Sequence, residues 1–299
     1  MKDLKHLYYF EKLLEDANND LVRQAKAEGR LALGYTCYHM PEVLLNLDGC
    51  FSVRLRAPRT GSMEIATYYM SNATCEYARA LLERGLEGGY KFLDAMAGVD
   101  VCECMNRGME NMELLGVNDP EKKGFFWCNL DSPCSDDEDC MAHLREQLSR
   151  KILKPLHENY GIDVSDAAIR KAVERHNEIC RLITEIGNFR KLDNPTITGY
   201  EFHILTLATY VCPKDLVVEK LRETLEELKT REPDPKKKFR AKVVVVGSEI
   251  DDPELISLIE DSGALVVADR FCYGSFPGRQ EIVLTEDEDA LTQVCRNYL

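Results

Sequence analysis

Cysteine is the residue type with the clearest capacity for chemistry in this sequence, because twelve cysteines occur in 299 residues. Reduced thiols act as metal ligands or nucleophiles where they are accessible, and as small apolar groups where they are buried. Thiolate ligands suit both zinc and iron–sulfur clusters. The sequence contains no C-x-x-C pair, and the spacing of Cys102 and Cys104 is too tight for a zinc knuckle. The spacings alone leave both kinds of site open.

Three further cysteines, Cys128, Cys134 and Cys140, are spread through the acidic stretch CNLDSPCSDDEDC. A metal site is one interpretation of this stretch. Runs of charged residues are more typical of solvated segments, so we expect a solvated acidic turn here.

The remaining cysteine-bearing segments follow or precede short periodic elements. The expected elements are helices at 1–30 and 77–88 and strands at 31–34, 50–55 and 92–101. Cys37 would lie in a strand-to-helix loop, Cys75 just before the second helix, and Cys102 and Cys104 just after the third strand. Alternating strands and helices indicate a doubly wound parallel sheet, in which ligands bind at the carboxyl ends of the strands. The sequence therefore predicts that these cysteines converge at one edge of the sheet.

Three successive segments are expected along the chain. Residues 1–138 form a first α/β domain, and residues 139–231 form a helical section with apolar residues at three- and four-residue intervals. The stretch TREPDPKKKFR at 230–240 is the best linker. Residues 241–299 form a second α/β domain with strands at 241–246 and 264–268 and helices at 252–261 and 287–299. Two parallel strands do not make a stable sheet alone, so we expect this domain to be incomplete and the chain to be a fragment.

Charge and composition exclude several classes of function. The formal net charge of −14 disfavours binding to nucleic acid, which depends on clustered Lys and Arg. There is no apolar run of the roughly 20 residues that a membrane span needs, and the first residues do not resemble a secretory signal, so a cytoplasmic location is expected. One local basic cluster, Arg54, Arg56 and Arg59, is either an anion-binding group or a solvated strand end.

Four segments together resemble the 2-hydroxyacyl-CoA dehydratase D-component family, which includes subunits of the 2-hydroxyglutaryl-CoA dehydratase and benzoyl-CoA reductase type. They are GYTCYHMPEVLLNLDGCFSVRL, SNATCEYARALLERGL, DVCECMNRGMENM and IRKAVERHNEICRLI, and the later stretch VVVVGSEIDDPELISLIEDSGALVVADRFCYG is similar to the second domain of that family. The resemblance spans nearly the whole chain. It rests on the order and spacing of these segments, because no one of them is decisive.

The resemblance implies two flavodoxin-like domains with helical connections and a [4Fe-4S] cluster held by three cysteines, or a double-cubane cluster in one related branch. By position in the family pattern, Cys75 and Cys102 are the first ligand candidates, the latter in a pattern shared by Glu103, Met105 and Arg107. Cys37, Cys104 and Cys272 are further candidates. The third ligand of family members comes from the late part of the second domain, which this chain is expected to lack.

The resemblance also implies an activity and partners. A family dehydratase is a dimer of related subunits, receives a low-potential electron from an ATP-dependent activator, and removes water from a 2-hydroxyacyl-CoA thioester through a ketyl radical. Arg54, Arg56 and Arg59 would then contact the phosphates of coenzyme A. Glu42 and His39 are candidates for proton transfer, although a helix-start carboxylate and a packed imidazole are the commoner roles. Alternatives are a benzoyl-CoA reductase-type or double-cubane reductase subunit, and a non-catalytic metal-binding or scaffold protein.

Overall fold

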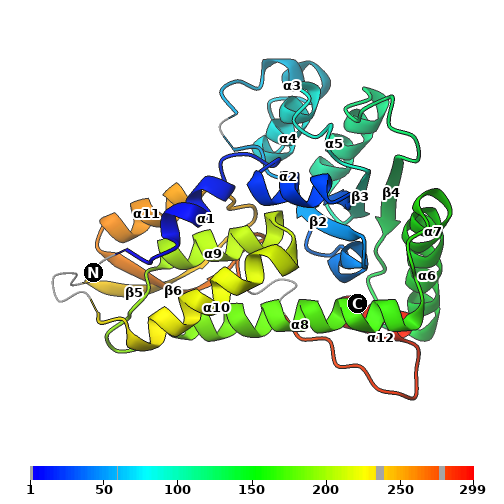
Figure 1. The fold of residues 1–299 in the computed structure, drawn as a ribbon. Coiled ribbons are helices and arrows are strands. Elements are labelled where there is room, and N and C mark those ends of the chain that lie inside the picture. The colour runs from blue at the N-terminus through cyan, green and yellow to red at the C-terminus, as the bar shows by residue number, and fades with distance from the viewer. Residues whose placement is uncertain (1–2, 59, 234–238, 276–279) are drawn as a thin grey trace. The chain divides into compact units, whose positions relative to one another are not determined.

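The structure, a computed structural model, describes residues 3–58, 60–233, 239–275 and 280–299 (Figure 1). Its contacts divide the chain into two compact units. Unit 1 comprises Met1–Glu15 and Arg175–Glu281, and unit 2 comprises Asp16–Glu174 and Ile282–Leu299. Each unit thus joins segments that are distant in sequence. This division differs from the three successive segments expected at 1–138, 139–231 and 241–299, because the two chain ends pack away from their sequence neighbours.

Unit 2 is built on a parallel sheet with the strand order β2-β1-β3-β4. The strands are β1 (Leu31–Tyr35), β2 (Cys50–Arg54), β3 (Ala95–Asp100) and β4 (Phe126–Asp131). Leu31 of β1 pairs with Cys50, and Leu33 pairs with Ala95. The first three strands confirm the predicted ones, and a mixed α/β architecture is confirmed with them.

The acidic stretch that begins at Cys128 is not a turn throughout, and this expectation was wrong in part. Cys128 is buried in β4, and Cys140 lies in the helix α6 (Glu138–Leu148). The exposed Asn129 and Asp131 alternate with the buried Cys128 and Leu130. Alternating burial is typical of a strand with one face covered by the core and one face exposed to solvent. The acidic residues around the strand hide this pattern in the sequence.

The helices of unit 2 precede the first strand, connect the strands or follow the last one. They are α2 (Asp20–Ala27), the 3₁₀ turn η1 (Glu42–Asn46), α3 (Glu64–Tyr69), α4 (Glu76–Leu86), α5 (Glu103–Leu114), α6, the π-helical turn η2 (Ser149–Leu153) and α7 (Lys154–Tyr160), with α12 (Ala290–Tyr298) at the chain end. The single helix expected at 1–30 is two helices, α1 (Leu7–Leu13) in unit 1 and α2. Asn19 begins α2, because its side-chain oxygen accepts hydrogen bonds from the amides of Leu21 and Val22, both at 3.1 Å.

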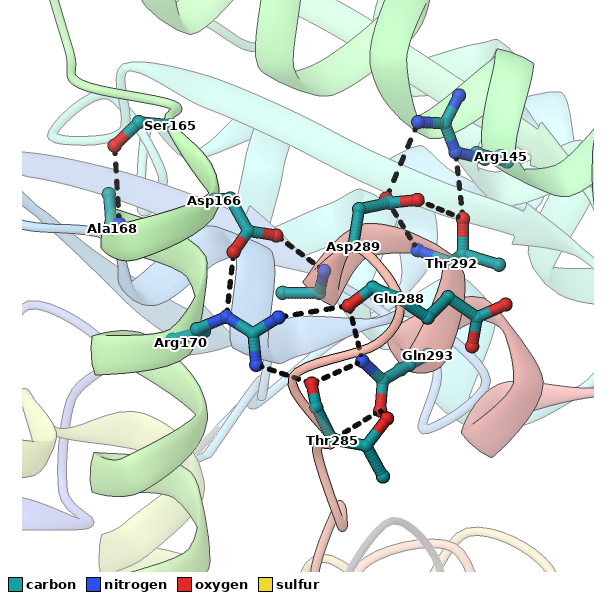
Figure 2. Close-up of polar contacts among 11 residues, drawn as sticks. Arg145, Ser165, Asp166, Ala168, Arg170, Thr285, Glu288, Asp289, Thr292 and Gln293 are labelled. Atoms are coloured by element: carbon teal, nitrogen blue, oxygen red, sulfur yellow. Dashed lines mark hydrogen bonds and ion pairs between the residues drawn. The ribbon is translucent and has the colours of Figure 1, made fainter.

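The C-terminal segment belongs to unit 2, which corrects the expectation that the helix at 287–299 covers the second sheet. Ala290, Leu291, Val294 and Cys295 are buried in the same apolar core as Leu33 and Leu130. Figure 2 shows the polar contacts that hold the segment. One apolar core therefore contains residues of β1 and of α12, which lie far apart in the sequence.

Arg170, on α8 (Asp166–Asn188), is the centre of these polar contacts. Its Nη1 and Nη2 donate to the carbonyl oxygens of Thr285 and Glu288, both at 2.9 Å, and its Nε donates to Asp166 at 2.6 Å. Asp166 in turn accepts from the amide of Ala290 at 2.5 Å (Figure 2). These bonds satisfy carbonyl groups that come just before α12, and so fix where that helix begins.

Unit 1 contains α1, the second half of α8, α9 (Gly199–Val211), α10 (Lys214–Thr230) and α11 (Pro253–Asp261), with β5 (Ala241–Val246) paired in parallel to β6 (Ala264–Arg270). The predicted strands at 241–246 and 264–268 are confirmed, and α9 and α10 lie within the helical section expected at 139–231. Val244 and Val246 of β5 are 59% and 72% exposed, so the apolar run at 241–246 is largely not buried. Part of the expected linker, residues 234–238, lies outside the described residues. Among the helices described here, none is long and apolar enough to cross a membrane.

We expect Arg170→Met to loosen the C-terminal segment. The substitution keeps the aliphatic stem but removes the three hydrogen bonds of the guanidinium group. The carbonyl oxygens of Thr285 and Glu288 still accept from Gln293, and Asp166 still accepts from the amide of Ala290, so the free energy of unfolding of unit 2 should fall by about 1–2 kcal/mol. Urea unfolding followed by the fluorescence of Trp127, the only tryptophan, measures this, because Trp127 lies in β4 of unit 2. Arg150→Met is the matched control, since Arg150 makes an exposed pair with Glu146 and its loss should change stability by less than about 0.5 kcal/mol. Equal effects of the two substitutions would contradict the role of Arg170.

Candidate functional site

The predicted cysteine loops follow three neighbouring strands of the unit 2 sheet. Cys37 lies two residues after the end of β1, Cys75 lies between β2 and β3, and Cys102 and Cys104 follow β3. All strands of this sheet are parallel, so the segments that leave their carboxyl ends emerge at one edge. The connection from β1 leads to β2 on one side, whereas the connection from β3 leads to β4 on the other. The carboxyl ends of β1 and β3 therefore flank a topological switch point, the usual place for a ligand in such sheets.

Two of these thiols occupy equivalent positions at the beginnings of helices. Cys75 is the N-cap of α4 and Cys102 is the N-cap of α5, neither side chain makes a capping hydrogen bond, and both residues are exposed. The two helices pack together: a methyl group added at Gly108 of α5 would lie 3.6 Å from the carbonyl oxygen of Ala78 on α4. The first turn of a helix presents free amide groups and a partial positive charge. An anionic group would therefore be favoured beside either thiol.

The loop at 36–41 carries Cys37 and His39, both half-buried. The imidazole of His39 lies against the ring of Tyr38, with their centroids 4.2 Å apart. Burial, reinforced by the positive charge of Arg54, lowers the pKa of His39 from its usual value of 6.5. His39 is thus an uncharged imidazole at neutral pH, which can accept a proton.

Glu42 is buried at the beginning of η1 and has defined partners. Its Oε2 accepts hydrogen bonds from the hydroxyls of Tyr35 and Ser52, each at 3.1 Å. Asn46 donates to the backbone oxygen of Glu42 at 2.8 Å and to the hydroxyl of Ser52 at 3.0 Å. The sequence does not reveal this network, because nothing in the spacing of Tyr35, Glu42, Asn46 and Ser52 predicts that they meet.

Arg54 and Arg56 of the basic cluster do not lie at a solvated strand end. Arg54 is 0% exposed and Arg56 is 4% exposed, and Arg59 lies outside the described residues. The backbone oxygen of Arg56 accepts from the hydroxyl of Tyr90 at 3.0 Å. Charged residues are usually exposed, so composition alone predicts the wrong environment. Every residue of β2 is buried, and Arg54, the last residue of this strand, is buried with the rest.

Cys272 belongs to unit 1 and follows β6, as expected. It is half-buried, and its amide donates to the backbone oxygen of Ser248 at 2.8 Å. The same turn is held by Asp269, which accepts from the amide of Ser275 at 2.6 Å and pairs with Arg190 at 3.0 Å. Both members of this ion pair are buried. The turn that carries Cys272 is therefore well fixed.

The remaining cysteines differ in how far they are exposed to solvent. Cys50, Cys128, Cys180, Cys212 and Cys295 are buried, Cys140 is half-buried, and Cys134 is exposed. Burial raises the pKa of Cys128 and that of Cys295 to about 12, so these thiols stay protonated and behave as apolar groups. The Sγ of Cys180 lies 3.3 Å from Nε2 of His176 on the same helix. Packing accounts for these buried residues.

A metal or cluster needs several ligands at once. The thiols of Cys75, Cys102, Cys37 and Cys104 have the donor chemistry that iron–sulfur clusters require. Across the described ranges, however, no group of three or more His, Cys, Asp or Glu side chains is arranged to hold a metal ion. The residues described here do not by themselves make a complete cluster site.

Comparison with known proteins decides the family. A sequence model described as 2-hydroxyglutaryl-CoA dehydratase, D-component, matches residues 37–299. The chain belongs to this family. The resemblance drawn from the cysteine segments is thereby confirmed.

Three relatives of known description show how similar the chain is to other members of the family. The chain is 23% identical over 286 residues to the beta subunit of the (R)-phenyllactyl-CoA dehydratase of Clostridium sporogenes, covering 93% of this chain and 71% of the relative. It is 24% identical over 265 residues to subunit beta of the (R)-2-hydroxyglutaryl-CoA dehydratase of Acidaminococcus fermentans, covering 85% and 65%. It is 22% identical over 279 residues to the putative dehydratase subunit YjiM of Escherichia coli, covering 89% and 69%. The chain thus matches about two thirds of the length of these proteins.

We expect His39 to titrate below pH 6.5 and to be neutral at pH 7, because burial and Arg54 oppose its protonation. A base whose pKa is lowered on folding takes up its proton more readily when unfolded, so its contribution to stability is present above about pH 6.5 and is lost as the pH falls below that value. NMR titration of the histidine ring signals, with His39→Gln to assign the resonance, measures the midpoint. The stability difference between wild type and His39→Gln should change between pH 7 and pH 5. A midpoint above 6.5 would contradict the buried position of the ring.

Proposed function

We propose that this chain is a subunit of an oxygen-sensitive 2-hydroxyacyl-CoA dehydratase, which removes water from a 2-hydroxyacyl-CoA thioester by way of a ketyl radical. The family membership supports an enzyme-associated role. The observation that carries the proposal further is the arrangement of unit 2, in which cysteine-bearing loops follow three neighbouring parallel strands around a switch point. Ligands bind at this position in open α/β sheets, and this edge carries thiols and an uncharged imidazole rather than a phosphate-binding glycine loop.

The proposed cofactor is a [4Fe-4S] cluster, or a double-cubane cluster, with Cys75 and Cys102 as the first ligands. Their exposure at the beginnings of two packed helices supports this assignment. Cys37 and Cys104, which belong to the same unit, are the further candidates for the remaining thiolate, whereas Cys272 belongs to unit 1. When bound, such a cluster would supply one-electron chemistry at low potential.

The chain's own side chains would then orient the thioester and handle protons. His39 is the proposed proton acceptor, since it is neutral and lies in the same loop as Cys37. Glu42, the other residue considered for proton transfer, is 7% exposed and accepts hydrogen bonds from Tyr35 and Ser52. Contact between coenzyme A phosphates and Arg54 or Arg56 would require the buried guanidinium groups to become accessible.

The proposal includes the wider setting of the reaction. The fold would be a pair of flavodoxin-like, doubly wound domains. Since two relatives are named as beta subunits, we propose that the chain pairs with a sister subunit of the same family in a dimer. An ATP-dependent iron–sulfur activator would deliver the electron, and the complex would work in the cytoplasm.

Two other readings compete with the dehydratase. A benzoyl-CoA reductase-type or double-cubane reductase subunit would use the same thiols but leave the electrons on its substrate. A non-catalytic scaffold would keep the fold without a cluster. The low identity to the relatives, 22–24%, does not separate these readings, but iron content and the fate of the substrate do.

The first prediction of this proposal concerns iron. Protein purified without oxygen should contain about four irons and four acid-labile sulfides per chain for one cubane. Cys75→Ser and Cys102→Ser should each remove most of the iron, because a serine oxygen is a poor replacement for a thiolate. Cys134→Ser is the matched control, since Cys134 is also exposed but lies after β4, and it should keep the iron. A colourless, zinc-loaded protein would contradict the iron–sulfur assignment.

The second prediction concerns turnover. The chain, combined with its sister subunit, an ATP-dependent activator and a strong reductant, should convert a 2-hydroxyacyl-CoA thioester to the 2-enoyl-CoA with release of water. (R)-phenyllactyl-CoA and (R)-2-hydroxyglutaryl-CoA are the first substrates to try, because the relatives are named for them. Net reduction of an enoyl or aromatic thioester without loss of water would favour the reductase. An iron-free complex that turns over neither class would favour the scaffold.

A further inference from the structure

The loop at 36–41 is tied at both ends by one buried polar network. Tyr35 is the last residue of β1, directly before the loop, and Glu42 is the first residue after it. The hydroxyl of Tyr35 donates to Oε2 of Glu42 at 3.1 Å, and this hydrogen bond joins the two ends. Cys37 and His39 lie between them. The geometry of the loop ends, and hence of the segment between them, depends on this contact.

The neighbouring strand supports the same carboxylate. Ser52, in the middle of β2, donates to Oε2 of Glu42 at 3.1 Å. Its position is set in turn by Asn46, whose Nδ2 donates to the Ser52 hydroxyl at 3.0 Å and whose Oδ1 accepts from the Ser52 amide at 3.1 Å. Asn46 also donates to the backbone oxygen of Glu42 at 2.8 Å. The carboxylate is thereby attached to β1 through Tyr35 and to β2 through Ser52.

Burial distinguishes this network from a set of surface contacts. Tyr35 is 1% exposed, Ser52 is 0% exposed, and Glu42 and Asn46 are each 7% exposed. Surface hydrogen bonds exchange with water at little cost, whereas a buried group that loses its partner keeps its desolvation penalty. A carboxylate this enclosed is also poorly placed to collect a proton from a substrate, since a general base must come within hydrogen-bond reach of the reacting atom.

We infer that Glu42 acts as an anchor rather than as a proton-transfer group, and that Tyr35, Ser52 and Asn46 are positioning residues for the loop that carries Cys37 and His39. The positioning itself is a property of the chain. That the loop presents reacting groups rests on the proposed function.

Hydrogen–deuterium exchange of the full chain tests the positioning. Tyr35→Phe removes the hydroxyl that joins the loop ends. Ser52→Ala removes the bond from β2 to Glu42 together with the bond that the Ser52 hydroxyl accepts from Asn46. Each should speed amide exchange in residues 36–41 about tenfold, because a charge-assisted buried hydrogen bond is lost from the closed state of the loop. The loop at 71–75, which precedes α4, should exchange within about twofold of wild type.

Tyr90→Phe is the matched control. Tyr90 is also 1% exposed, lies in the same unit, and loses one buried hydrogen bond, to the backbone oxygen of Arg56 at 3.0 Å, but has no contact with Glu42 among those described. It should leave exchange at 36–41 unchanged. Equal exchange at 36–41 in Tyr35→Phe and Tyr90→Phe would overturn the inference, as would a parallel rise at 71–75, which signals general loosening. If Tyr35→Phe does not fold, Ser52→Ala alone decides by the same criteria.

Turnover separates this inference from the proposed function. In an active complex, Tyr35→Phe and Ser52→Ala should lower kcat more than Tyr90→Phe does, and leave KM within about twofold, because the loop is proposed to position reacting groups rather than to bind coenzyme A. A wild-type complex that dehydrates no thioester overturns the proposed function, while the exchange result still decides the positioning. Faster exchange at 36–41 with unchanged kcat would support the anchor and remove the loop from the reacting site.

Discussion

The pairing of β1 with β3 is the constraint on which the rest of unit 2 depends. Leu33 pairs with Ala95 and Tyr35 with Ala97, so two strands separated by an entire β–α–α crossover become neighbours. The connection that leaves β1 runs to β2 on one side of the sheet, and the connection that leaves β3 runs to β4 on the other side. The carboxyl ends of β1 and β3 therefore flank the topological switch point. Cys37 and Cys102 are carried to this point by topology alone. Loss of this pairing would separate the cysteine loops even if each loop kept its local structure.

Sequence periodicity predicts the helices and strands whose pattern is complete within their own segment. It fails for elements whose buried face is covered by residues distant in the sequence. The strands at 31–34 and 50–55 and the helix after Cys75 follow from periodicity and are confirmed. β4 was missed because its single covered face depends on η2 and α6, which follow it in sequence. The helix at 287–299 was predicted, but its partner was not, because the periodicity of α12 indicates an apolar face without indicating which core receives it.

In the candidate site too, the order of the elements is predictable from the sequence, whereas the contacts between distant residues are not. The sequence predicts that Cys37, Cys75 and Cys102 follow successive strands, since this needs only the order of elements. It does not predict that Arg54 is buried, because a charged residue in a strand reads as exposed unless the covering residues are known. The bond between Tyr35 and Glu42 is equally hidden. Two residues seven positions apart meet only because the intervening loop turns back, and this turn has no sequence signature.

Exposure separates the thiols that can react from those that cannot. A cysteine whose pKa burial raises to about 12, such as Cys128 or Cys295, stays protonated at physiological pH and behaves as an apolar group. The many cysteines of this chain are thus not one functional set. Those at the N-caps of α4 and α5 lie where a negative ligand is favoured, and those in the core replace small apolar residues. Burial therefore separates the thiols of the core from the exposed ones at the N-caps of α4 and α5.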